Sequence, residues 1–441
     1  PFREPFTRAH HFLCSPFHRS RPRTSGLAMF SGMNPSNRST TSGMDAGVSC
    51  ADAGNSVGEL GWVMDGPQPN GAAGRFRPVR VQRQVHDHLV ELRRVDPHAP
   101  ADAHAHLFTG APLHGVRERL VFGNAYLGAA PIVAALDAGA EIVITGRVAD
   151  AALFLGPLVH GLGWKLAGAT AQPDLDRLAQ GLTVGHLLEC SGQGSGGNFG
   201  SQGAWQAIPD LAHIGYPVAE VWEDGSAVIT KAPGTGGLVN FDTVRQQLLY
   251  EVHNPHAYVS PDVVLDMGGI QLQDEGGDRV RLTGARGTAP PDTLKVVAGY
   301  RDGYKAEVTW GFSWPDAWDK AQAAEATIRT LLKEKRVPHD ELYVEYPGLN
   351  SAHGALAPLP KPDALNQANE IWTRLVLRTQ DKAAADGFGR LFPWMGLSGP
   401  AYTCGFTGLH NTSELLGIWP TLVPRAEVEA GVKVEHLGDT A

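Results

Sequence analysis

The sequence predicts an α/β protein: a mostly parallel sheet covered by helices, followed by a β-α-β-β-α-β ferredoxin-like sandwich. Helix-like and strand-like segments alternate between residues 123 and 162, which is typical of helices that cover a parallel sheet. Between residues 304 and 423, strand and helix patterns follow the β-α-β-β-α-β order. The chain has 441 residues, 42% of them hydrophobic, which is enough for two or three domains.

Residues 107–290 are expected to form the α/β domain. Its elements are, in order, an Ala-rich helix at 123–139 that ends at Gly139, a buried strand at 141–145, an amphipathic helix at 148–162, a short helix that begins at Thr183 and ends at Cys190, strands at 217–222 and 226–231, and a helix at about 241–253. Asp224-Gly225 predicts a hairpin between the two strands, because both central turn residues would take φ > 0.

Residues 291–427 are expected to form the ferredoxin-like region, and residues 428–441 a tail. A hairpin is predicted around Asp302-Gly303. The strand at 304–312 alternates, with Tyr304, Ala306, Val308, Trp310 and Phe312 on one face. The remaining elements are a helix with Trp318, Ala321, Ala324, Ile328 and Leu331 on its apolar stripe, a strand at 341–346, a Pro-rich loop at 347–363, a strand at 370–378, a helix at 381–392 and a strand at 417–423.

Residues 1–106 differ in composition from the rest of the chain. They hold eight of the 18 histidines, many Arg, Pro and Ser residues, and few runs with helix or strand periodicity. The chain begins with Pro1, and three interpretations stay open: a frameshifted translation of GC-rich DNA, a disordered segment, or an organelle transit peptide within residues 1–44. The pairs His86/His88 and His104/His106 resemble metal ligands, but no regular element holds them, so no metal site is predicted.

Charge and hydropathy exclude two classes of partner. A net charge of −9 argues against a nucleic-acid-binding surface, and no apolar run of about 18 residues predicts a membrane span. Cys14, Cys50, Cys190 and Cys404 lie far apart, without the spacing of a zinc site. They are expected to be free thiols in a cytoplasmic protein, unless residues 1–44 direct the chain to an organelle.

The first candidate site segment is TGRVADAAL, residues 145–153. It lies where a strand ends and a helix begins, the usual ligand-binding edge of an open α/β sheet. Helix-start N–H groups favour anions, and Arg147 adds a planar charged fork for a carboxylate or phosphate. Asp150 is a candidate general base. The alternative is a plain strand–turn–helix in which Arg147 forms a salt bridge.

The second candidate is GHLLECSGQGSGGNFGS, residues 185–201. His186 and Glu189 are three residues apart on a predicted helix face, so they could serve as an acid–base pair. The Gly-rich run that follows could approach a ligand closely. Cys190 could be a nucleophile, although a buried thiol is the commoner outcome.

The third candidate is ITKAPGTGGLV, residues 229–239. Lys231 comes before a Gly-Thr-Gly-Gly turn, an arrangement that could hold the phosphates of coenzyme A or a nucleotide. The segment matches neither a P-loop nor a dinucleotide fingerprint, so a plain loop is the alternative.

Four segments in the same order resemble the acyclic terpene utilisation (AtuA-like) family. They are GNAYLGAAPIVAALDAGAEIVITGRVADAALFLGPLVHGLGW, GHLLECSGQGSGGNFG, IGYPVAEVWEDGSAVITKAPGTGGLV and ARGTAPPDTLKVVAGYRDGY. The resemblance runs from about Leu107 to about Arg425. It implies a role in degrading acyclic terpenes through coenzyme A thioesters, with a C–C lyase step on a branched hydroxyacyl-CoA.

The resemblance assigns no catalytic residue, so the site residues are predicted from local chemistry. Asp150, His186 and Glu189 are the catalytic candidates, and no metal ligand is expected. The substrate-binding candidates are Asn124, Tyr126, Thr145, Gly146, Arg147, Cys190, Gly194, Gly196, Gly197, Lys231, Gly234, Thr235, Gly236 and Gly237. The expected ligand is an acyl-CoA or isoprenoid acid, with coenzyme A entering as part of the substrate. The sequence identifies no other cofactor and leaves a homo-oligomer open. A non-catalytic accessory or binding subunit of the same pathway is the alternative function.

Overall fold

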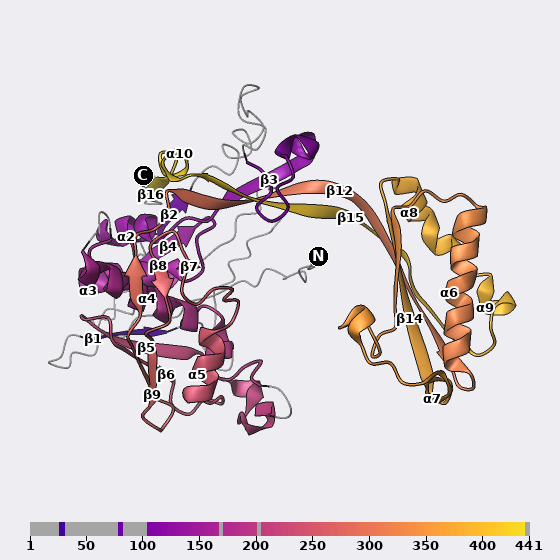
Figure 1. Cartoon of the computed structure of the whole chain (residues 1–441), viewed down its shortest axis with the longest axis horizontal. Coiled ribbons are helices and arrows are strands. Elements are labelled where there is room, and N and C mark those ends of the chain that lie inside the picture. Colours follow the sequence, from indigo (N-terminus) through magenta and orange to yellow (C-terminus); the bar gives the residue numbers. More distant parts are fainter. Residues whose placement is uncertain (1–25, 31–77, 83–103, 167–170, 201–203, 437–441) are drawn as a thin grey trace, which may run out of the picture. The chain divides into compact units, whose positions relative to one another are not determined.

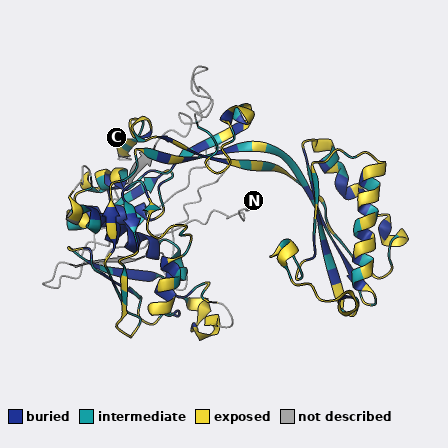
Figure 2. Ribbon diagram, viewed as in Figure 1, coloured by how far each residue is buried: buried dark blue, intermediate teal, exposed yellow. Residues whose placement is uncertain are grey.

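The computed structural model describes residues 26–30, 78–82, 104–166, 171–200 and 204–436 (Figure 1). The chain divides into two compact units, which are described separately. Unit 1 comprises residues 1–110, 123–297 and 420–441, and unit 2 comprises residues 111–122 and 298–419. Figure 2 shows buried residues inside each unit. The pairs His86/His88 and Cys14/Cys50 lie outside the described residues.

The described residues of unit 1 form three small sheets. The largest has the order β1 (Gly26–Phe30), β5 (Pro217–Trp222), β6 (Ala227–Lys231), β10 (Val280–Thr283) and β9 (Gln271–Asp274), and every neighbouring pair is antiparallel. The second has the order β11 (Arg286–Thr288), β8 (Val264–Asp266) and β7 (Tyr258–Val259), also antiparallel. The third has the order β16 (Lys433–His436), β2 (Pro78–Gln82) and β4 (Ile142–Thr145).

The prediction of a mostly parallel sheet covered by helices is wrong. Among the strand pairs with a described register, only β2 and β4 run parallel. The short links from β5 to β6 and from β9 to β10 explain the difference, because a parallel pair needs a crossover of a dozen or more residues. The parallel arrangement predicted from the alternation between residues 123 and 162 therefore does not extend to the strands that follow it.

Two stretches of residues 1–106 contribute strands to these sheets. β1 pairs with β5, from Gly26 opposite Trp222 to Phe30 opposite Val218. β2 pairs with β4 on one side and with β16 on the other. β16 lies in the segment predicted as a tail, directly after the short helix α10 (Arg425–Glu429).

Three of the four longer helices described in unit 1 begin at residues other than those predicted, whereas the fourth begins at the predicted residue 241. The four helices are α2 (Ala130–Asp137), α3 (Ala152–Leu162), α4 (Gln172–Leu188) and α5 (Phe241–Leu248). The predicted helix at 123–139 begins instead inside strand β3 (Leu120–Ala125), because pairing with another strand overrides the helix propensity of this Ala-rich run. Gly139 follows the helix with φ +85°, so the predicted stop is confirmed.

The predicted helix start at Thr183 is wrong. Thr183 lies in the interior of α4, fully buried, and its hydroxyl donates a hydrogen bond to the carbonyl of Ala179 at 2.8 Å. A threonine can satisfy its hydroxyl in this way within a helix, so it need not mark an N-cap.

One predicted hairpin is confirmed and the other is wrong. β5 and β6 form the antiparallel pair around Asp224-Gly225, but only Gly225 takes positive φ, at +89°. Asp302 and Gly303 lie inside one continuous strand, β12 (Thr293–Ser313). The strand continues because residues 304–313 pair without interruption with β14 (Glu370–Thr379).

Unit 2 is built around a five-stranded sheet, four strands of which have the order β13 (Glu341–Glu345), β14, β12 and β15 (Thr403–Pro424). Strand β3 also pairs with β12. The two main helices are α6 (Ala317–Glu334) and α8 (Lys382–Phe388). Along the chain the elements run β12, α6, β13, β14, α8, β15, the β-α-β-β-α-β order. The Pro-rich loop holds the short helix α7 (Pro362–Asn366), α9 (Met395–Ser398) comes before β15, and the strand predicted at 417–423 is the end of the 22-residue β15.

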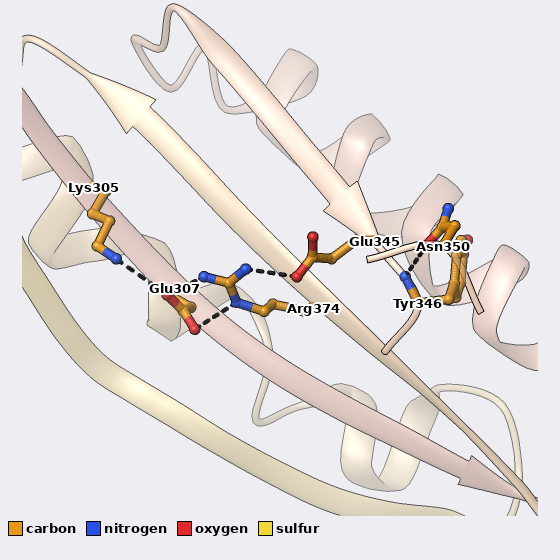
Figure 3. Close-up of polar contacts among 6 residues, drawn as sticks. All are labelled: Lys305, Glu307, Glu345, Tyr346, Asn350 and Arg374. Carbon is orange, nitrogen blue, oxygen red and sulfur yellow. Dashed lines mark hydrogen bonds and ion pairs between the residues drawn. The ribbon is translucent and has the colours of Figure 1, made fainter. Parts of the chain in front are cut away.

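The two faces of this sheet have different chemistry. Ala306, Val308, Trp310 and Phe312 are buried in one core with Ala321, Ala324 and Ile328 of α6, as the alternating pattern predicts. On the other face, Arg374 donates to Glu307 at 2.7 and 2.9 Å and to Glu345 at 2.6 Å, and Lys305 contacts Glu307 at 3.4 Å (Figure 3). The hydrogen bonds from Arg374 hold the pKa of Glu307 below its usual value.

Candidate functional site

Tyr126 and Arg147 are brought together by backbone contacts in unit 1. The N–H of Leu127 donates to the carbonyl of Arg147 at 3.3 Å, and the N–H of Ala149 donates to the carbonyl of Leu127 at 2.8 Å. The Arg147 guanidinium then lies over the Tyr126 ring, 4.6 Å from its centroid, and donates to its hydroxyl at 3.1 Å. Asn124, in β3, lies two residues before Tyr126 and is partly buried.

The turn before α3 satisfies several of its own N–H groups. Those of Ala149, Ala152 and Leu153 donate to the carbonyls of Leu127, Ala149 and Asp150. Thr145 is buried at the end of β4, whereas Gly146 faces open space. Arg147 and the exposed Asp150 form an ion pair at 3.5 Å. The candidate ligand-binding groups of this segment are therefore the charged side chains of Arg147 and Asp150.

Helix α4 packs closely against this turn because it carries glycine at the contact. A Cβ built on Gly185 would lie 2.5 Å from the carbonyl oxygen of Ala151. One helical turn later, Glu189 follows the last residue of α4. The negative charge of Asp150 acts on Glu189 and raises its pKa. The structure thus brings two of the three predicted catalytic residues, Asp150 and Glu189, into one electrostatic cluster.

Glu189 has a strongly raised pKa. Burial, followed by the charges of Asp150 and Glu251, raises its pKa to about 7, against the hydrogen bond from Cys190. That bond runs from Cys190 Sγ to Glu189 Oε1 at 2.9 Å. Burial and the neighbouring Glu189 charge raise the pKa of the Cys190 thiol far above its ordinary value. At neutral pH, Cys190 is therefore a thiol that donates, and not a thiolate nucleophile.

Three further members of the cluster, Tyr250, Glu251 and Tyr258, are not among the residues that the sequence predicts for the site. Burial is the largest cause that raises the pKa of Tyr250 and of Tyr258 to about 12. Glu251 adds negative charge to both tyrosines and to Glu189. These residues follow α5 in a stretch without a motif, so only their position in space identifies them.

His186 is held apart from the solvent. It is 3% exposed, and its ring packs against Tyr258 with centroids 5.4 Å apart. Burial lowers the pKa of His186, so the ring is neutral at pH 7. Its Nε2 has no hydrogen-bond partner among the residues that the structure describes. No hydrogen bond joins it to Glu189 within the described ranges, so their role as an acid–base pair stays a prediction.

Two of the Gly-rich segments lie against each other. The N–H of Leu238 donates to the carbonyl of Ser195 at 2.8 Å, and a Cβ on Gly237 would lie 2.7 Å from the same oxygen. Gly194, Gly196, Gly197 and Gly236 are also in tight contact with protein atoms. Among the predicted glycines of these loops, Gly234 alone faces open space, at φ +77°. A pocket shared by all three segments stays a prediction.

Lys231 is held inside the protein. Its side chain is 8% exposed, pairs with Asp278 at 3.2 Å and donates to the carbonyl of Thr235 at 2.9 Å. Thr235 in turn donates to the carbonyl of Ala232 at 2.6 Å. Phosphate contact by Lys231 and residues 234–237 stays a prediction, and it would require the Asp278 pair to rearrange.

Two features are absent from the described ranges. Within them, no three His, Cys, Asp or Glu side chains lie together in a way that could hold a metal ion. Across the same residues, no helix has both the length and the apolar character needed to cross a membrane.

Comparison with known proteins gives one match. The model of the family described as "Acyclic terpene utilisation family protein AtuA" matches residues 86–434. The match includes every predicted site residue, and it begins before Leu107, where the resemblance in the sequence was expected to start. No curated protein and no solved structure matches the chain.

Proposed function

Because the chain belongs to the acyclic terpene utilisation family, we propose that it is an enzyme of acyclic terpene breakdown in which Glu189 is the general base. The substrate that we propose is a branched hydroxy acid linked to coenzyme A, and the reaction is cleavage of a C–C bond. The single observation that carries this proposal is the pKa of Glu189, raised to about 7 in a cluster with Asp150 and Glu251.

A carboxyl group with a pKa near the working pH can both accept and return a proton. In the proposed reaction, ionised Glu189 takes the proton of the substrate hydroxyl. The C–C bond next to that carbon then breaks, its electron pair moves toward the thioester to form an enolate, and the hydroxyl carbon becomes a ketone. Protonated Glu189 returns a proton to the enolate. The step is redox-neutral and consumes no other reactant.

The neighbouring groups suit these roles. The Cys190 thiol donates to Glu189 Oε1, which fixes the orientation of the carboxylate. The Arg147 fork, 3.5 Å from Asp150, offers positive charge for an anionic group of the substrate. Neutral, buried His186 supports the Tyr258 ring at 5.4 Å. Asp150 adds the charge that helps keep the Glu189 pKa high.

The test is turnover of a panel of branched 3-hydroxyacyl-CoA thioesters, with ketone and shortened thioester separated by chromatography. The wild type should cleave at least one, with a rate that rises with pH through about 7. Glu189→Gln should lower kcat by about 10²- to 10⁴-fold, the usual contribution of a general base. Glu223→Gln changes an exposed glutamate of the same unit and should leave kcat intact. Binding of the thioesters without cleavage by the wild type would contradict the proposal and favour an accessory binding subunit.

A further inference from the structure

Lys295 brings a second positive charge to the ring of Tyr126. The carbonyl of Lys295, in β12, accepts a hydrogen bond from the N–H of Tyr126 at 2.9 Å. Its Nζ lies 5.3 Å from the centroid of the Tyr126 ring, whereas the Arg147 guanidinium carbon lies 4.6 Å from the same centroid. The ring of one tyrosine therefore contacts two cations that lie far apart in the sequence.

Lys295 adds a positive charge that no ion pair matches among the described residues. Arg147 has Asp150 at 3.5 Å, but exposed Lys295 has no ion-pair partner within the residues that the structure describes. Because both cations contact one ring, they lie within about 10 Å of each other, about one Debye length, so salt screens their repulsion only in part. The π-face of Tyr126 attracts both, but a ring is a weaker partner for an ammonium than an anion is.

We propose that Tyr126, Arg147 and Lys295 form an anion clamp that takes a carboxylate or phosphate group of the substrate. Arg147 supplies a planar fork, Lys295 a mobile point charge, and both make charge-assisted hydrogen bonds to such a group. The Tyr126 hydroxyl accepts from Arg147, which leaves its own proton to donate to the same anion.

Asp150 connects the clamp with the proposed base. It pairs with Arg147 at 3.5 Å, and its charge also acts on Glu189. An anion held at the clamp is therefore next to a carboxylate that influences the proposed base. This inference rests on the proposed function, because the bound anion is taken to be part of the substrate. Binding of an anion at the clamp can nevertheless be measured without turnover.

The test measures binding of three probes: succinate, coenzyme A and 3′-dephospho-coenzyme A. Calorimetry measures the binding of coenzyme A and 3′-dephospho-coenzyme A, and the shift in melting temperature measures the binding of succinate. Lys295→Gln should weaken at least one probe by about tenfold, and Lys295→Arg, which keeps the charge, should restore most of the affinity. Lys165→Gln removes an exposed lysine of unit 1 that contacts neither Tyr126 nor Arg147 among the described residues, and it should leave every affinity unchanged.

The pattern of losses identifies the source of the anion. Weaker succinate binding places a substrate carboxylate in the clamp. Weaker coenzyme A binding with unchanged binding of the dephospho form places the 3′-phosphate there. Equal affinities in wild type and Lys295→Gln, for all three probes, would overturn the anion clamp. If Lys295→Gln loses binding and the wild type cleaves no thioester, the anion clamp is supported and the proposed lyase reaction is contradicted. Failure of the clamp and failure of the proposed function are therefore distinguishable.

Discussion

Gly185 lies so close to Ala151 that a Cβ added to it would be 2.5 Å from the Ala151 carbonyl oxygen and 3.0 Å from the Ala151 Cα. This contact joins the middle of α4 to the turn that carries Arg147 and Asp150. Because Glu189 lies one helical turn beyond Gly185, the contact also determines how near Glu189 is to Asp150.

Gly185→Ala should therefore destabilise the protein. Alanine favours a helix over glycine by up to about 1 kcal/mol, but the clash with a backbone oxygen requires α4 to move, and such overpacking typically costs about 1–3 kcal/mol. We expect a lower melting temperature and a weaker rise of the Glu189 pKa, since Asp150 moves away. Gly387→Ala is the control, because Gly387 lies in α8 with open space around its Cα. An unchanged or higher melting temperature for Gly185→Ala would contradict the close contact.

Glu189→Gln should make stability less dependent on pH. The pKa of Glu189 is about 7 in the folded protein, above its ordinary value of 4.5, so the folded protein binds the proton more tightly. The resulting stabilisation is complete below about pH 4.5 and is lost as pH rises through about 7. At about 1.4 kcal/mol per unit, the loss is at most on the order of 3 kcal/mol. Denaturant unfolding of wild type and Glu189→Gln from pH 4 to 8 measures it.

Asp262 provides the comparison for this measurement. Its Oδ1 accepts from the N–H of Ala129 at 2.8 Å, and burial raises its pKa to about 6 from 3.8. Asp262→Asn should reduce the pH dependence of the free energy of unfolding between about pH 3.8 and 6. The pH dependence above that range should remain, because it comes from Glu189. If Glu189→Gln keeps the wild-type slope between pH 6 and 8, Glu189 does not titrate there.

Arg147→Lys should weaken ligand binding more than it weakens folding. Lysine keeps the charge but loses the planar fork and the stacking on Tyr126, so affinity for an anionic ligand should fall by about 1–3 kcal/mol. The ion pair with Asp150 is partly exposed and is typically worth about 0–1 kcal/mol, so the melting temperature should change little. Ligand affinity and melting temperature, measured on the same Arg147→Lys variant, distinguish a binding role from a structural role. Lower stability with intact affinity would assign Arg147 a structural role only.

Arg374→Ala should destabilise unit 2. Arg374 joins Glu307 and Glu345 across three strands, and the Glu345 side chain is only 9% exposed (Figure 3). Removing the arginine leaves a nearly buried carboxylate without its partner, so we expect a loss of about 2 kcal/mol or more at pH 7. The double variant Arg374→Ala/Glu345→Gln should recover part of it. Chemical unfolding checks both, and equal stability of wild type and Arg374→Ala would refute the role of this network.

Several features of the molecule follow from the sequence alone. Alternation places Ala306, Val308, Trp310 and Phe312 in the core of unit 2, because each strand turns successive side chains to opposite faces. The Gly139 stop and the hairpin at Gly225 follow from local backbone freedom. The family resemblance also came from residues close together along the chain, and the family match confirms it.

Tertiary structure decided the sheet directions and the members of the site. A hairpin turn predicts that β5 and β6 run antiparallel, but no local pattern predicts that β1 pairs with β5 or that β10 pairs with β6, because these strands lie far apart along the chain. Likewise Glu251 stands in no quoted segment, and Lys295 lies in the fourth segment of the resemblance without any local sign of a site. Both acquire a role only because strand pairing and helix packing bring them to Glu189 and Tyr126. The raised pKa of Glu189 comes from burial and from charges distant in sequence, and these are properties of the folded chain.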